Sequence, residues 1–299
     1  MALVSGMDYC AYSHHAAMLE RTGLDWLIAV YETYLDDSGT NAQSEIAIAA
    51  CYVSTEPGWR NFVKEWNAAS TEEGFEKFHM AEFVAKNDQG HKPWCEWDVA
   101  KKTRVYKRLA TIINENKRIG VACAIPKAVY DAVPLRIRKH WGMEHYTYAV
   151  RMCLMRIAEW RAKSLISQPM QYVFDWEDSW TPKYKEISGL MGGVHEKLKP
   201  MFGLDSGGFM FQRKQVYKPL QAADILAWQM NNHMRKIYPN GENEENLPKV
   251  LHEGFRQLRQ DQEMDLGFFT ETNMQAWITK IEAFEAENGV LYPDETESV

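Results

Sequence analysis

One segment, Pro219–Met234, restricts the fold of this chain more than any other. It reads PLQAADILAWQMNNHM, with proline at the first position of a predicted helix, and Asp224 is its only formally charged residue. A helix that is apolar on most faces is expected to be buried, and an unpaired carboxylate inside it costs several kcal/mol. Gln221 and Trp228 share the face of Asp224, and neither is a counter-ion. The chain therefore needs layers that enclose this helix, and Asp224 needs a pairing partner or a bound cation.

Shorter apolar segments indicate what those layers are. Trp26–Leu35 and Ile46–Val53 flank turn-forming residues at 36–41, which predicts a hairpin of two strands. We expect further strands at Gly120–Ile125, Met170–Asp175 and Gly208–Val216, an extended stretch at Phe75–Met80, and helices at Trp59–Ala69, 98–116, His145–Lys163, Lys183–Lys199, Pro219–Ile237, Glu253–Arg259 and Met274–Glu287. Antiparallel strands followed by alternating helices and strands predict an α/β fold with a mixed sheet and helices on both faces.

The composition is typical of a globular protein. The 299 residues are 45% hydrophobic and 25% charged, which excludes a disordered, collagen-like or coiled-coil chain. No apolar run is long enough to span a bilayer and no signal peptide is evident, so we predict a cytoplasmic protein without a membrane partner. Five scattered cysteines without a CxxC pair, three of them in apolar runs, indicate reduced core thiols rather than zinc ligands or disulfides. We expect an N-terminal extension at 1–24, a main domain at 25–238 and an acidic helical segment at 239–299.

Charge is distributed unevenly along the chain. Residues 101–163 hold 15 basic and 4 acidic residues, whereas residues 239–299 hold 4 and 14. The basic region has the electrostatic character of a phosphate-backbone binder, although solvated helices carry such charges too. The acidic region is expected to be solvated, with the alternative that it competes with nucleic acid for the basic region. Our candidates for phosphate contacts are Arg136, Arg138, Lys139, Lys214 and Lys218.

Two more acids end apolar strands. Asp36 closes the first predicted strand and Asp175 a later one, although Asp36 also suits a turn and Asp175 a helix cap. If the two strands are neighbours, both acids lie at one sheet edge, within reach of Asp224 on its helix. Oxygen ligands without His or Cys select Mg²⁺ or Mn²⁺. Two such ions about 3.5–4 Å apart activate water and stabilise the leaving oxygen in phosphoryl transfer.

Four segments resemble the domain-of-unknown-function family numbered 3800. YLDDSG at 34–39 is similar to its [YF]-[IL]-D-E-S-G opening, with Asp37 in the place of Glu. FHMAE at 78–82 is similar to its short His-then-Glu segment, and YVFD at 172–175 to its later strand ending in Asp. PLQAAD at 219–224 is similar to its [GP]-[LI]-Q-x-A-D helix, the most specific of the four.

The resemblance implies a ribonuclease H-like fold with a five-stranded mixed sheet and a carboxylate site at its edge. It implies metal ligands at Asp36, Glu82, Asp175 and Asp224, which would hold Mg²⁺ or Mn²⁺. Accessory candidates are Asp37, His79, Glu177 and Gln221.

Our leading hypothesis is a metal-dependent nuclease that hydrolyses DNA or RNA. The sequence lacks the motifs of elbow-type serine hydrolases, P-loop NTPases, dinucleotide dehydrogenases and zinc peptidases. Two alternatives stay open: a non-catalytic member of the same fold that binds nucleic acid or a protein, and a hydrolase of small phosphoesters. A homodimer through the C-terminal helices is also compatible with the sequence.

Overall fold

The computed structural model describes most of the chain. The described residues are 30–85, 91–176, 182–205, 207–238, 258 and 264–289. The predicted extension at 1–24, Glu177, and the predicted helix Glu253–Arg259 apart from Leu258 lie outside them.

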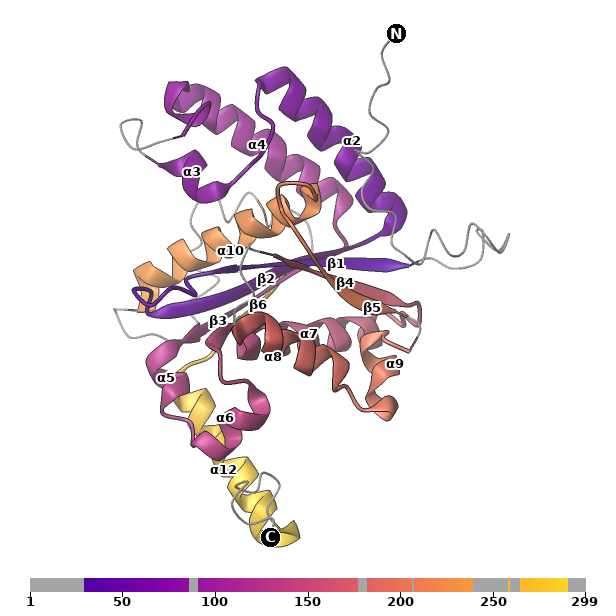
Figure 1. The fold of residues 1–299 in the computed structure, drawn as a ribbon, viewed down its shortest axis with the longest axis vertical. Helices are drawn as coiled ribbons and strands as arrows, with labels where there is room; N and C mark the ends of the chain where they lie inside the picture. The colour runs from indigo at the N-terminus through magenta and orange to yellow at the C-terminus, as the bar shows by residue number, and fades with distance from the viewer. Residues whose placement is uncertain are drawn as a thin grey trace, which may run out of the picture.

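Six strands form one mixed sheet (Figure 1). They are β1 (Tyr31–Ser38), β2 (Ile46–Thr55), β3 (Ile119–Pro126), β4 (Met170–Asp175), β5 (Gly208–Gln212) and β6 (Met264–Phe268), in the order β5-β4-β1-β2-β3-β6. Strand β2 is antiparallel to β1 and β3, whereas the pairs β1–β4, β4–β5 and β3–β6 are parallel. The predicted α/β fold, with antiparallel first strands and parallel later ones, is confirmed.

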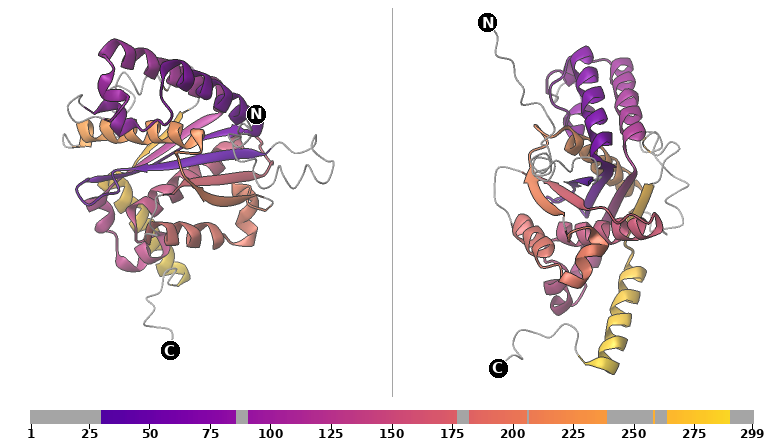
Figure 2. Two further views of the ribbon diagram at one scale, coloured as in Figure 1. Left: turned by 45° about the horizontal axis from the view of Figure 1, so that its top comes forward. Right: turned by 90° about the vertical axis from the view of Figure 1, so that its right-hand side faces the viewer.

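Helices cover both faces of the sheet (Figures 1 and 2). One layer holds α2 (Glu56–Glu73), α3 (Met80–Val84), α4 (Val99–Asn116) and α10 (Lys218–Ile237). The other holds α5 (Lys127–Asp131), α6 (Leu135–Trp141), α7 (His145–Lys163), α8 (Pro182–Gly192) and α9 (Lys199–Phe202). Helix α12 (Glu271–Asn288) begins against the second layer and projects away from the body (Figure 2). Within the described part of the chain, no helix combines the length and apolarity needed to cross a membrane.

Three segments differ from the sequence predictions. The resemblance implied five strands, but β6 adds a sixth, in a region for which only helices were predicted. The predicted strand Gly208–Val216 ends at Gln212, and the remainder is a turn that carries Lys214. The predicted helix Lys183–Lys199 stops at Gly192, where consecutive glycines weaken helical structure. The stretch Phe75–Met80, for which only an extended conformation was predicted, has no regular secondary structure before α3 begins at Met80.

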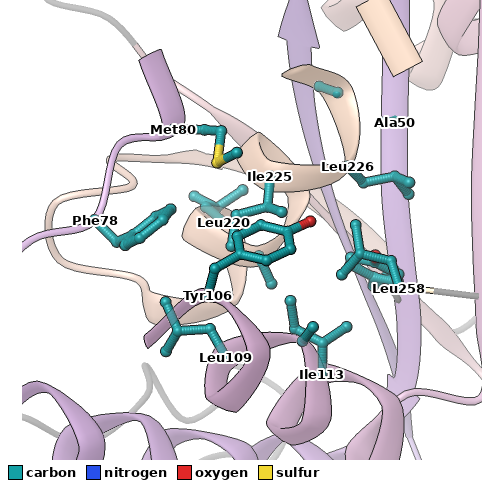
Figure 3. Packing of buried hydrophobic residues seen from close by; sticks show 14 of the residues in the cluster. Ala50, Phe78, Met80, Tyr106, Leu109, Ile113, Leu220, Ile225, Leu226 and Leu258 are labelled. Atoms are coloured by element: carbon teal, nitrogen blue, oxygen red, sulfur yellow. The ribbon is translucent and has the colours of Figure 1, made fainter. Parts of the chain in front are cut away.

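The core between α4 and α10 fixes the segment that leads into α3. Figure 3 shows Tyr106, Leu109 and Ile113 of α4 facing Leu220, Ile225 and Leu226 of α10, with Phe78 and Met80 at their side. Phe78 and Met80 are 1% and 2% exposed. Their burial leaves the intervening residue, His79, at a fixed place next to α10.

The opposite core contains the thiols that the sequence placed inside the protein. Cys51, Cys123 and Cys153 are buried and unpaired, which agrees with the prediction of core thiols. Cys95 is partly buried, and Cys10 lies outside the described residues.

A buried acid at the start of β1 makes stability depend on pH. Glu32 is 3% exposed and accepts a hydrogen bond from the Tyr34 hydroxyl at 3.0 Å. Burial raises the pKa of Glu32 to about 7. Because the unfolded chain releases this proton near pH 4.5, the folded protein binds more protons between pH 4.5 and 7. Stability from this group is therefore lost as pH rises through that window.

We predict that Glu32→Gln removes this loss, because a glutamine oxygen still accepts the bond from Tyr34. Urea denaturation should find the variant more stable than the parent at pH 8, by up to roughly 3 kcal/mol. The difference should shrink towards pH 5. Glu115→Gln, at an exposed acid, serves as the control, and an unchanged pH profile in Glu32→Gln would contradict the assignment.

Candidate functional site

The alternation of side chains along β1 and β4 directs two acids to one face of the sheet. Tyr34 and Val173 are register partners on these strands, and both pack in the core beneath α10. Side chains two residues apart in a strand point the same way. Asp36 and Asp175 therefore lie side by side at the carboxyl ends of parallel strands, facing α10. They are 1% and 6% exposed.

Helix α10 brings the third acid and fixes the loops around it. Asp224 is 5% exposed, and its Oδ2 accepts a hydrogen bond from the Met80 backbone N–H at 2.6 Å. One turn earlier, the fully buried Gln221 accepts from the Phe78 N–H at 3.1 Å and donates to the Lys214 carbonyl at 2.8 Å. The Gln-x-x-Asp spacing thus ties two irregular segments to one helix face.

Lys214 lies at the centre of the three acids. Its Nζ is 2.9 Å from Asp36 Oδ2, and 3.4 Å from both Asp175 Oδ2 and Asp224 Oδ1. Its backbone N–H donates to Asp175 Oδ1 at 2.9 Å. The cation that the buried Asp224 required is therefore an ammonium group. We call Asp36, Asp175, Asp224 and Lys214 the carboxylate cluster.

Burial and ion pairing oppose each other in this cluster. Burial raises the pKa of Asp36, and the Lys214 ammonium counteracts that rise. Burial of Lys214 disfavours its charged form, but Asp36, Asp224 and Asp175 outweigh that effect and hold the pKa of Lys214 well above its usual range. The lysine therefore stays charged at neutral pH, whereas the pKa of Asp36 stays well above its usual range because burial and the neighbouring acids outweigh the effect of Lys214.

The carboxylate oxygens of the cluster are suitable ligands for a hard divalent cation, but their distances from the central cation are those of an ammonium group. Mg²⁺ binds oxygen at about 2.0–2.1 Å, whereas the carboxylate oxygens lie 2.9–3.4 Å from Lys214 Nζ. Within the described residues, no set of three or more His, Cys, Asp or Glu side chains is arranged to hold a metal ion. An ion at this centre would require Lys214 to move out and the acids to close by roughly an ångström.

A cavity of about 490 Å³ opens in front of the cluster. Its walls include Asp36, Asp224 and Lys214, with further basic or aromatic side chains from Lys127, Lys183, His79, His145, Tyr146 and Trp228. Lys127 donates to the Asn41 carbonyl at 2.6 Å. Lys183 and Lys127 were not predicted as site residues. The one available signal was their position, because each stands at the start of a helix next to this edge of the sheet.

The accessory candidates take different positions. Asp37 follows Asp36, so it faces the other side of the sheet, where its Oδ1 accepts from Lys183 Nζ at 2.9 Å. His79 lies with Nε2 3.6 Å from Asp224 Oδ1 and Nδ1 3.5 Å from Glu82 Oε1. Glu82, predicted as a metal ligand, is 40% exposed at its side chain and reaches the cluster only through His79. It does not line the cavity.

The predicted phosphate contacts on α6 do not line this cavity. Arg136 pairs with Glu285 at 2.7 Å, and Arg138 with Asp131 at 3.5 Å. Lys139 lines a different cavity, between α6 and α9. Lys218 donates to the Glu76 carbonyl at 2.7 Å. Of the five candidates, only Lys214 belongs to the site.

Comparison with known proteins provides no assignment. No family model matches the chain, and no curated protein matches it. The resemblance to family 3800 therefore stays a prediction, and function has to be inferred from the geometry of the carboxylate cluster.

We predict that Lys214→Met destabilises the metal-free protein by about 3–5 kcal/mol, because it leaves buried acids without a counter-charge. Adding Asp36→Asn should recover part of the loss, since one fewer charge is then buried. Urea denaturation in EDTA measures both changes. Lys92→Met, at a lysine whose side chain is 80% exposed, is the control and should leave the midpoint unchanged. Additive effects of the two cluster substitutions would contradict the pairing.

Proposed function

We propose that this protein is a metal-dependent nuclease that hydrolyses phosphodiester bonds of DNA or RNA at the carboxylate cluster. One observation carries the proposal. Three buried carboxylates from β1, β4 and α10 converge on a single cation at one wall of an open cavity. Acids from elements this distant in the chain are costly to bury together. Binding of Mg²⁺ or Mn²⁺ would explain why the chain buries these acids together despite that cost.

Residues of the chain would divide the work between binding and positioning. Bound divalent ions would supply an activated water and stabilise the leaving oxygen. Asp36, Asp175 and Asp224 would hold the ions, with Glu82 acting through His79. Lys214, once out of the centre, has the cavity as its nearest open space, where an ammonium can pair with a phosphate oxygen. Lys183 and Lys127 would orient the same phosphate from the opposite wall.

The protein would recognise its substrate mainly through the phosphate group. The cavity presents three lysines and two histidines, and the aromatic side chains of Tyr146 and Trp228 offer surfaces for a base. Its volume of about 490 Å³ admits one or two nucleotide units, while its open side leaves room for the rest of a strand.

A non-catalytic cluster is the second candidate, and the position of Lys214 favours it. An ammonium already neutralises the acids, as it would in a structural ion-pair network with no metal. Such a protein would bind nucleic acid or a protein partner without turnover. The two experiments that follow distinguish this candidate from the nuclease.

The first experiment is cleavage of labelled single-stranded and double-stranded DNA, RNA and hybrids with Mg²⁺ or Mn²⁺. We predict metal-dependent cleavage that falls at least roughly a hundredfold in Asp36→Asn and in Asp224→Asn, because each removes a ligand worth several kcal/mol in the transition state. Glu196→Gln, at an acid whose side chain is 81% exposed on the far layer, is the control. Cleavage that survives both EDTA and Asp224→Asn would reject the nuclease. Turnover of a small phosphodiester without cleavage of any polynucleotide would instead indicate a small-phosphoester hydrolase.

The second experiment measures binding of Mn²⁺ by electron paramagnetic resonance, without substrate. We predict that Lys214→Met binds Mn²⁺ at least tenfold more tightly than the parent, because the ammonium no longer competes for the same oxygens. Asp175→Asn should weaken binding in either background. If neither the parent nor Lys214→Met binds Mn²⁺, the cluster is a structural ion-pair network.

A further inference from the structure

A second cavity lies in the helical layer on the other face of the sheet, between α6, α7, α8 and α9. It measures about 690 Å³, larger than the cavity at the carboxylate cluster. Leu154, Leu190 and Phe202 contribute to an apolar lining, while Lys139 and Arg151 add positive charge. We call it the α6–α9 cavity. Its lining suits an occupant that carries both apolar and acidic groups, although one acid, Glu186, lines it as well.

The end of α12 is tied to the helix that forms one wall of this cavity. Glu285, in the last turn of α12, pairs with Arg136 of α6 at 2.7 Å, and the Glu285 side chain is only 9% exposed. Lys139 lies one turn further along α6, at the α6–α9 cavity. A second pair, Arg156 with Asp265, also joins the basic middle of the chain to its acidic C-terminal region. The chain that continues after Gly289 therefore starts four residues beyond a contact with α6, one of the helices that line the cavity.

Residues 290–299 have the chemistry and the length to fill it. They read VLYPDETESV, with an apolar half that ends at Pro293 and an acidic half that contains Asp294, Glu295 and Glu297. Leu291 and Tyr292 follow Gly289 by two and three residues, a reach of at most roughly 10 Å, and the acids follow by five to eight residues, a reach of up to roughly 27 Å. The apolar half matches the lining of the cavity, and the acidic half matches Lys139 and Arg151.

We propose that residues 290–299 dock in the α6–α9 cavity of their own chain, with Leu291 and Tyr292 on its apolar lining and the acids beside Lys139 and Arg151. The interaction is independent of the proposed nuclease activity. It braces a wall that lies next to the carboxylate cluster. Glu186 lines the α6–α9 cavity and accepts hydrogen bonds from the Met143 and Glu144 N–H groups, both at 2.9 Å, and Glu144 lines the cavity at the cluster.

The test uses the full chain with the photo-cross-linking residue p-benzoylphenylalanine at position 292. After irradiation, we expect cross-links within one chain, mapped by mass spectrometry to side chains of the α6–α9 cavity. Changing Asp294, Glu295 and Glu297 together to Lys should lower the yield at least fivefold, and adding Lys139→Glu should restore part of it. Lys64→Glu, on the opposite layer, is the control for Lys139→Glu and should restore nothing.

A substitution that fills the cavity is a second variant, and it leaves the charge unchanged. Gly189 lines the cavity, and a Cβ added there meets no atom within 4 Å, so a side chain at this position starts in open space and Gly189→Leu is expected to take up part of the cavity. We expect it to lower the cross-linking yield at least fivefold with no loss of melting temperature. Cross-links to another face, cross-links between two chains, or yields unchanged in both the charge-reversed tail and Gly189→Leu would overturn the proposal.

Discussion

The structure depends on how negative charge is enclosed at one edge of its sheet. Asp36, Asp175 and Asp224 are nearly inaccessible to water, and three ionised acids this close repel one another unless a cation lies between them. Lys214 provides that charge in the structure described here. The same requirement links β1, β4, α10 and the turn after β5, which are far apart in the chain. The site is therefore complete only when these four segments are packed together.

Helix α10 is the element that joins core and site. Its apolar residues, such as Leu220 and Leu226, pack against the sheet and α4, and this packing sets the helix rotation. That rotation in turn presents Gln221 and Asp224 to the segments around Phe78 and Lys214. A large-to-small substitution in this core would therefore shift the acids as well as lower the stability of the protein. In the proposed nuclease, exchange of the ammonium for a divalent ion would need Lys214 to move out and the acids to close by roughly an ångström, and both movements are local to this end of α10.

Local patterns were enough to predict the acids but not their counter-ion. The ends of apolar strands marked Asp36 and Asp175, and the absence of other charge marked Asp224. Lys214 lies in an irregular turn whose position is set by the pairing of β5 with β4, so no periodicity indicated that it belongs among the acids. Strand β6 was missed because five residues containing Asp and Gly resemble a loop until β3 offers an edge to pair with. Arg136 was taken for a phosphate contact because its partner, Glu285, is distant in the sequence.

The pairing of distant charges changes what the uneven charge distribution means. A basic middle region suggested a surface for a nucleic-acid backbone, yet Arg104, Arg108, Arg136 and Arg156 each pair with an acid of another element. Two of these acids, Glu285 and Asp265, come from the C-terminal region, so folding cancels part of the asymmetry. A phosphate would instead meet the lysines that line the cavity at the carboxylate cluster. In the proposed nuclease, a substrate would have to compete with the carbonyl and carboxylate oxygens that these lysines already contact. A cavity of this size would therefore favour binding of one phosphodiester at a time over coating of a long duplex.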